Sequence, residues 1–253
     1  MQADVHPKCE SFLDGSNPRA LAIRSLAALD PNRDIYTLAI VGELNLPKLR
    51  CDRPDLEIFV TDALLDSLKA GTAEVSLTVP KEGDAPFIAL SGFTGSLIID
   101  FKDSDSAFVM GHCQNFSFKA LMYANSFISI GRATSCNSCS ATVSDAVIVL
   151  GSDCMLSHGI ILQPSDQHDI IDIDTGMVIN QKRSIVIDRH VWIGKEAYIG
   201  AGVTIGKDSI VGARSVVAAS VPEATIVAGN PAKAVKSGIS WTRRFTRSAS
   251  NEQ

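Results

Sequence analysis

The sequence predicts a mainly β protein, a parallel β-helix, because a strict six-residue period runs from Trp192 to Val217. A branched aliphatic residue recurs at every sixth position and a small residue follows it, in the pairs Ile193-Gly194, Ile199-Gly200, Ile205-Gly206, Val211-Gly212 and Val217-Ala218. An α-helix repeats every 3.6 residues and a strand every two, so neither explains the period. We expect each short strand to send one aliphatic side chain inward, and the small residue to let the backbone turn tightly.

The composition fits one elongated domain with a smaller module. The chain has 253 residues, and only 6% are aromatic, as expected for a narrow core of Val, Ile and Leu. No apolar stretch is long enough to span a bilayer. The first ten residues, MQADVHPKCE, lack the basic and then apolar layout of a signal peptide, so we expect a cytoplasmic protein.

The charge is unevenly distributed along the chain. Residues 1–180 hold 12 Lys and Arg against 23 Asp and Glu, a net charge of −11, whereas residues 181–247 hold 11 against 4, a net charge of +7. A basic repeat region on an acidic protein favours a small polyanionic ligand, such as a nucleotide-phosphate cofactor. Nucleic acid is disfavoured, because the basic residues are dispersed and not interleaved with aromatic ones.

The six cysteines show no disulfide-framework spacing. Cys136 and Cys139 form a single C-x-x-C pair without a second pair to complete a metal site. We interpret both as small residues of the β-helix wall.

Residues 1–85 predict a mixed α/β module in which helices alternate with strands. The expected helices are Pro18–Leu29 and Asp62–Ala70, and the expected strands are Tyr36–Val41 and Glu74–Val79. The sequence assigns this module no function.

Residues 86–237 predict the β-helix domain, with less regular coils before the strict period begins. Between 163 and 184 the period stops in a polar excursion that carries His168, and such an interruption of a solenoid is typically functional or disordered. A short C-terminal helix is expected from Ala232, and residues 238–253 are expected to form a flexible tail.

The run VWIGKEAYIGAGVTIGKDSIVGARSVV, followed by IVAGNPAKAVK, resembles the hexapeptide-repeat acetyltransferases, whose fold is a left-handed parallel β-helix. The loop SDQHDIIDIDTGMVIN is most similar to that of the capsular sialic acid and polysaccharide O-acetyltransferases. This resemblance implies a homotrimer with active sites between neighbouring subunits, and acetyl-CoA bound along the coils.

The resemblance also implies the catalytic residues. His168 stands where the family places its catalytic histidine, and a histidine is a suitable general base near neutral pH. Asp166, Asp169 and Asp172 are candidates to orient it, and the sequence does not choose among them. Trp192 corresponds to a tryptophan tied to catalysis, so we assign it to the active-site wall; its alternative role is to shield the coil.

Acceptor binding is assigned to Asn137 and His158, although Asn137 equally fits a structural turn. His190 precedes the strict repeat and is interpreted as a surface corner, whereas His6 and His112 carry no motif. The ten-residue spacing of His158 and His168 does not fit the three-histidine zinc site of the related β-helical carbonic anhydrases, so no metal is expected.

Six residues are assigned to acetyl-CoA because they match the family's cofactor positions: Lys195, Ala213, Ala218, Pro231, Lys233 and Lys236. The lysines suit phosphates as point charges. Ala219 stands where relatives often have a basic residue, so Arg214 is a further candidate for phosphate binding.

The predicted function is acetyl-CoA-dependent O-acetylation of a sugar hydroxyl, with sialic acid or polysaccharide as the leading acceptor. The transfer is expected to be direct, since no cysteine or serine has a recognisable nucleophile setting. One alternative is N-acetylation of an amino sugar or of an antibiotic at the same site. A non-catalytic β-helix scaffold is the other.

Overall fold

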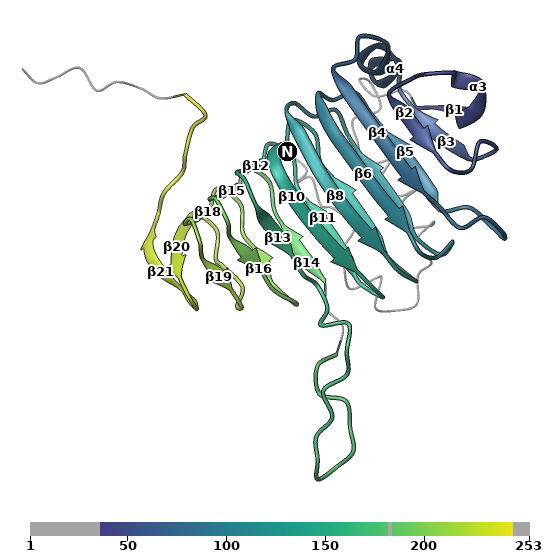
Figure 1. Cartoon of the computed structure of the whole chain (residues 1–253). Coiled ribbons are helices and arrows are strands. Elements are labelled where there is room, and N and C mark those ends of the chain that lie inside the picture. Colours follow the sequence, from purple (N-terminus) through teal and green to yellow (C-terminus); the bar gives the residue numbers. More distant parts are fainter. Residues whose placement is uncertain (1–35, 182–183, 245–253) are drawn as a thin grey trace, which may run out of the picture.

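The computed structural model describes residues 36–181 and 184–244, and it confirms a mainly β chain wound as a parallel solenoid (Figure 1). One sheet contains eight strands: β1 Thr37–Ile40, β3 Glu57–Val60, β5 Phe87–Leu90, β7 Ala107–Met110, β9 Phe127–Ile130, β11 Val147–Leu150, β14 Ile185–Ile187 and β17 Thr204–Ile205. Every neighbouring pair in this sheet is parallel except β1 with β3.

The second sheet contains thirteen strands and branches after its fifth. Its unbranched part is β2 Leu49–Cys51, β4 Ala73–Thr78, β6 Gly95–Phe101, β8 Phe116–Met122 and β10 Ser135–Val143. One branch is β12 Met155–Leu156, β15 Trp192–Ile193, β18 Ile210–Val211, β20 Thr225–Gly229 and β21 Ala232–Ser237, and the other is β13 Ile160–Leu162, β16 Tyr198–Ile199 and β19 Val216–Val217.

The branch marks a change in the shape of the coils. Strand β10 pairs with both β12 and β13, so one long strand gives way to two short strands on separate faces. From there each coil has three corners, which we number along the chain. The first corner includes residues 188–191, the second 194–197 and the third 200–203.

The earlier coils have their own period of twenty residues. Phe87 pairs with Ala107, Ala107 with Phe127, and Phe127 with Val147. All four residues of each of these four strands are buried, as is typical of parallel strands covered on both faces. This longer period does not show at six-residue spacing, although four-residue, mainly apolar blocks recur every twenty residues in the sequence.

The interior confirms the six-residue prediction. Ile193, Ile199, Ile205, Val211 and Val217 are all buried in one continuous core. Burying such a side chain contributes about 1.5–3 kcal/mol, so a column of stacked aliphatic residues supplies much of the coil stability.

The predicted N-terminal elements within the described ranges are also confirmed. The expected strands appear as β1 and β4, and the expected helix is α4 Asp62–Lys69, where the Thr61 hydroxyl accepts a hydrogen bond from the Leu64 backbone N at 3.3 Å. A one-turn helix, α3 Val41–Leu44, follows β1. The expected helix over residues 18–29 lies outside the described residues. Both sheets continue across residue 85, since β3 pairs with β5 and β4 with β6.

The predicted C-terminal helix is wrong, because residues 232–237 form β21, which pairs antiparallel with β20. The last parallel strand of a solenoid exposes unpaired N–H and C=O groups. A hairpin strand satisfies these groups, and this tertiary demand overrides the helix-like composition of the segment.

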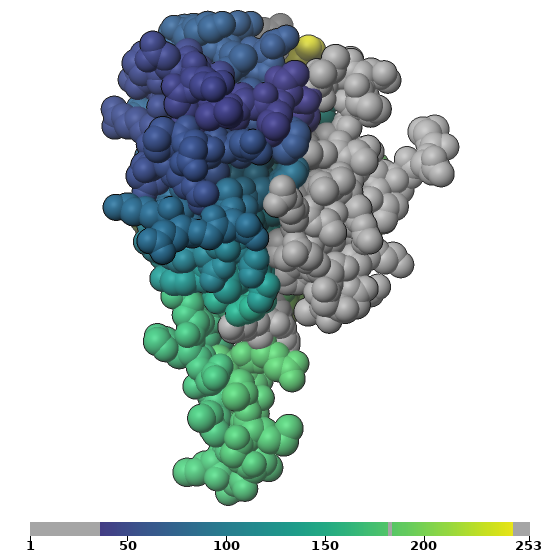
Figure 2. Space-filling model, turned by 90° about the vertical axis from the view of Figure 1, so that its right-hand side faces the viewer, coloured from purple at the N-terminus to yellow at the C-terminus, as the bar shows by residue number. Residues whose placement is uncertain are grey.

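The polar excursion forms a hairpin arm, residues 163–181, that projects away from the solenoid body (Figures 1 and 2). An isolated antiparallel bridge joins Ile171 to Val178. Among the described residues, no helix has the length and apolar character needed to cross a membrane.

Candidate functional site

The two predicted acceptor residues lie on neighbouring coils at the second corner. Asn137 belongs to β10 and His158 follows β12. Hydrogen bonds join the two coils: Ser138 donates its backbone N–H to the Ser157 carbonyl at 3.3 Å, and Gly159 donates to the Ser138 hydroxyl at 2.8 Å. Both predicted side chains are exposed.

The same corner continues into the predicted cofactor residues Lys195 and Ala213. The Glu196 backbone N–H donates to the His158 carbonyl, and that of Arg214 donates to the Lys195 carbonyl, each at 2.8 Å. Asn137, His158, Lys195 and Ala213 therefore line one edge of the solenoid, which we call the second-corner column.

The column ends at the β20–β21 hairpin. Gly229 donates its backbone N–H to the Ser215 hydroxyl at 3.2 Å, which holds the turn containing Pro231 beside the second corner. Lys233 and Lys236 lie on β21, exposed, and neither forms an ion pair with any residue in the described ranges. Their charges are available to a phosphate-bearing ligand.

Midway along the column, Glu196 binds two cations. Its carboxylate accepts from Arg214 Nε at 2.7 Å and lies 3.4 Å from Lys195 Nζ. The hydrogen bond from Arg214, followed by that from Lys195, lowers the pKa of Glu196. Because these two cations are paired, the hairpin lysines carry the unpaired positive charge of the column.

His168 lies at the base of the arm, exposed, and Asn180 holds its backbone. Asn180 Nδ2 donates to the His168 carbonyl at 2.8 Å and to Asp166 Oδ2 at 3.0 Å, while its Oδ1 accepts from the Ile170 backbone N at 2.6 Å. Three hydrogen bonds thus fix the chain on both sides of His168. No sequence motif marked Asn180, since its role depends on how the hairpin closes.

Two of the three candidate orienting carboxylates, Asp166 and Asp172, have other partners. Asp172 Oδ1 accepts from the backbone N of Asp174 and from both the N and the hydroxyl of Thr175, at 2.8–3.1 Å, and the Thr175 bonds lower the pKa of Asp172. Asp172 therefore stabilises the tip of the arm. No hydrogen bond from any of the three candidate aspartates to the His168 ring is present within residues 163–181.

Trp192 lies on β15, in register with Met155 and Ile210, and its side chain is 38% exposed. The arm leaves the solenoid at the third corner, between β13 and β14, and Ala218 lies at the same corner two coils further on. Within the described ranges no hydrogen bond joins Trp192 to His168. Trp192 lies between the first and second corners and the arm leaves at the third, so the two predicted catalytic residues belong to different sides of the coil.

Tyr198 is a site residue that the sequence reasoning missed. It lies on β16, two positions before a glycine, as Trp192 does in its own repeat. Burial, followed by the negative charge of Asp166, raises the pKa of the Tyr198 phenol. Tyr198 pairs in register with Ile161, on the strand that leads into the arm, so it lies beside the base of the arm.

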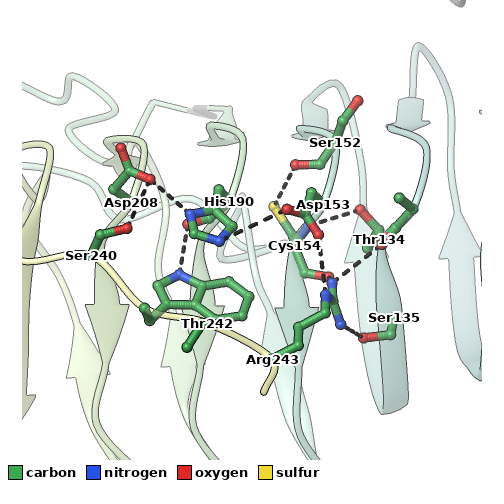
Figure 3. Close-up of polar contacts among 12 residues, drawn as sticks. Thr134, Ser135, Ser152, Asp153, Cys154, His190, Asp208, Ser240, Thr242 and Arg243 are labelled. Carbon is green, nitrogen blue, oxygen red and sulfur yellow. Dashed lines mark hydrogen bonds and ion pairs between the residues drawn. The ribbon is translucent and has the colours of Figure 1, made fainter. Parts of the chain in front are cut away.

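Beside Trp192, residues 238–244 run along the first corner as a C-terminal strap (Figure 3). Trp241 stacks on His190 with 4.2 Å between ring centroids, donates its indole N–H to the His190 carbonyl at 2.8 Å, and packs tilted against Trp192 at 6.2 Å. The other side of His190 is held by Asp208, with 2.7 Å between Nδ1 and Oδ1. The strap therefore supports the wall on which Trp192 stands.

Comparisons with known proteins agree with this fold. Residues 184–219 match the family Bacterial transferase hexapeptide (six repeats). The chain is 44% identical over 115 residues to a polysialic acid O-acetyltransferase of Escherichia coli O1:K1, covering 45% of this chain and 38% of that protein. It is 31% identical over 89 residues to a polysialic acid O-acetyltransferase of Neisseria meningitidis, covering 35% and 41%. The chain thus spans about two fifths of the length of these relatives.

Two solved structures share the architecture. The crystal structure of the polySia-specific acetyltransferase NeuO aligns with a TM-score of 0.63 and 25% identity, covering 72% of this chain and 83% of that one. The polysialic acid O-acetyltransferase OatWY aligns with a TM-score of 0.53 and 24% identity, covering 71% and 88%. The resemblance to hexapeptide-repeat acetyltransferases of the capsular type is therefore confirmed in sequence and in fold.

Proposed function

We propose that this protein is an O-acetyltransferase that moves the acetyl group of acetyl-CoA to a hydroxyl of sialic acid within a polysaccharide. The observation that carries the proposal is the 44% identity over 115 residues to a polysialic acid O-acetyltransferase. The second-corner column supports it, because it aligns the predicted acceptor residues with most of the predicted acetyl-CoA residues along one edge.

His168 is the proposed general base. Its neutral imidazole takes the proton of the acceptor hydroxyl as the hydroxyl oxygen bonds to the thioester carbonyl carbon. The carbon–sulfur bond then breaks, and the imidazolium returns the proton to the departing thiolate. Asn180 keeps His168 in place for both steps.

The acetyl-CoA site follows the column toward the hairpin. Lys195 and Ala213 would hold the pantetheine arm, and Pro231, Lys233 and Lys236 would hold the adenine and phosphate end. The unpaired lysines of β21 fit phosphates electrostatically. Trp192 would form the wall at the acetyl end. A cytoplasmic location, where acetyl-CoA is supplied, is part of this proposal.

A homotrimer completes the proposed site. The arm exposes six large apolar side chains, with Ile173 95% exposed: Ile170, Ile171, Ile173, Met177, Val178 and Ile179. A contiguous apolar surface of this kind marks a contact with another protein. A neighbouring copy that covers the arm would bring His168 of one chain to Trp192 of the next, which a single chain does not do. Ala218 lies at the same corner as the arm, so it would contact acetyl-CoA in the same interface between two subunits.

The test is release of free thiol from acetyl-CoA, measured with sialic acid, sialic acid polymer, amino sugars and neutral sugars as acceptors. We expect release with the sialic acids and a loss of about 10²–10⁴-fold in kcat for His168→Ala, the usual contribution of a general base. Asp174→Asn, at the tip of the same arm, is the matched control and should retain activity. Near wild-type turnover by His168→Ala would refute the assigned base, and release with amino sugars alone would refute O-acetylation.

A further inference from the structure

The C-terminal strap closes a polar pocket at the first corner. The pocket has a volume of about 620 Å³, within the range of small-ligand sites. Its walls come from three successive coils and from the strap, and they include Gln114, Arg132, Ser152 and Arg243. Every lining residue except Ala133 has a polar side chain, so the pocket suits a polar ligand such as a sugar.

Arg243 fixes the strap wall of this pocket (Figure 3). Its guanidinium pairs with Asp153, with 3.1 Å between Nε and Oδ1. It also donates to the Ser135 hydroxyl at 2.8 Å and to the carbonyls of Ala133 and Cys154 at 3.2 and 2.9 Å. Four hydrogen bonds to neighbouring coils make this wall preorganised, which lowers the entropy cost of binding.

The pocket lies on the same face as Trp192. Trp192 pairs with Met155, and Met155 pairs with Ser135, which lines the pocket. Two strand spacings separate Trp192 from Ser135, a distance of about 10 Å. When one sugar unit of a polymer lies at Trp192, a neighbouring unit of the same polymer therefore reaches the pocket.

The charge at the first corner favours an anion. Arg132 lines the pocket, Arg189 lies in the next corner along the solenoid, and Arg244 ends the strap. Arg189 and Arg244 form no ion pair with other residues of the described chain. The corner also holds three carboxylates: Asp153 is balanced by Arg243, Asp208 faces His190, and Asp188 accepts a hydrogen bond from the Arg189 backbone N at 2.6 Å.

We propose that this pocket binds a carboxylate-bearing sugar unit of the acceptor polymer, adjacent to the unit that is acetylated. The inference rests on the proposed function and deepens it, since it assigns a subsite that a polymeric acceptor occupies and a single sugar does not. Arg132 supplies the charge that recognises the carboxylate, and the strap supplies the opposite wall.

The test compares sialic acid monomer with long sialic acid polymer as acceptors for Arg132→Gln. We expect the KM for the polymer to rise about tenfold, the effect of losing one charge-assisted hydrogen bond, with the KM for monomer and for acetyl-CoA unchanged. Arg50→Gln, which removes an exposed arginine charge on β2 at the far end of the solenoid, is the control and should leave all three KM values unchanged.

An equal change in KM for monomer and polymer, or no change for either, would overturn the subsite. Equilibrium binding separates this inference from the proposed function. If neither acceptor is acetylated, the proposed function fails, but polymer binding followed by tryptophan fluorescence still tests the pocket. Weaker binding by Arg132→Gln than by Arg50→Gln supports the pocket; equal binding, or equally tight binding of uncharged dextran, overturns it.

Discussion

Two glycines at the same position of the six-residue repeat should respond differently to alanine. A Cβ added at Gly194 would lie 2.6 Å from the backbone N of Ala213 and 2.9 Å from the carbonyl O of Val211, whereas ordinary contacts begin near 3.4 Å. At Gly200 the nearest atoms are the Val217 carbonyl O at 3.3 Å and the Tyr198 ring at 3.5 Å. Neither glycine has a left-handed φ, so only the packing differs.

The magnitudes follow from these distances. At Gly194 the next coil must move, which costs about 1–3 kcal/mol for overpacking and about 1 kcal/mol for weakening the 2.8 Å hydrogen bond from Gly194 to Val211. Alanine restricts the unfolded chain more than glycine does, and this raises the free energy of unfolding by about 0.4–1 kcal/mol. Gly194→Ala should therefore lose about 1–3.5 kcal/mol of stability, whereas Gly200→Ala should stay within about 1 kcal/mol of the wild type.

The assay is urea unfolding of both variants, followed by far-ultraviolet circular dichroism, together with calorimetric titration of acetyl-CoA. Gly194→Ala should unfold at lower urea and bind acetyl-CoA more weakly, because it displaces Ala213 in the second-corner column. Gly200→Ala should match the wild type in both. Equal urea midpoints for the two variants would refute the packing argument.

Three further predictions concern the thiol core, the arm and the strap. Burial raises the pKa of the Cys154 thiol from 9.0 to about 12, so the folded chain keeps a proton that the unfolded chain releases, and stability should fall as pH rises from 9 to 12. Urea midpoints across that range measure the fall, and Cys154→Ala should reduce it. Asn180→Ala removes three hydrogen bonds around His168 and should lower kcat about tenfold with little change in KM for acetyl-CoA; a change confined to KM would contradict its positioning role. Arg243→Ala should release the strap and shift tryptophan emission to longer wavelength. The free energy of unfolding, measured with urea, should fall by less than about 1 kcal/mol, because the coils retain their own core. Unchanged emission would show that Arg243 does not hold the strap.

Much of the solenoid was predictable because a narrow core imposes its period directly on the sequence. Ile193 and Ile199 are buried as the repeat requires, and α4 begins beside the capping Thr61. The predicted helix from Ala232 failed because the free edge of β20, a feature of the assembled sheet, determines what that segment becomes. The twenty-residue period was present in the sequence but is invisible to a search at six.

The candidate site was less predictable, because it depends on contacts between distant segments. His168 and the lysines were nominated from residue types and from resemblance, and their roles stay predictions. The positions of Asn180 and Tyr198 were not predictable from the sequence, since they depend on how the arm closes and on how β13 pairs with β16. The strap was expected to be a flexible tail, yet Arg243 bonds to residues about 90–110 positions earlier in the chain.

The sequence by itself determined the repeating coil, because every aliphatic residue at six-residue spacing must leave water and only a parallel solenoid buries all of them. It also nominated the side chains that are proposed to move a proton or to bind a phosphate. Only the tertiary structure decided which of these side chains share an edge, that Gly194 is packed tightly and Gly200 is not, and that a polar pocket forms under the strap. Such features depend on how successive coils stack and on how the C-terminal strap packs against them, and no local sequence pattern encodes that geometry.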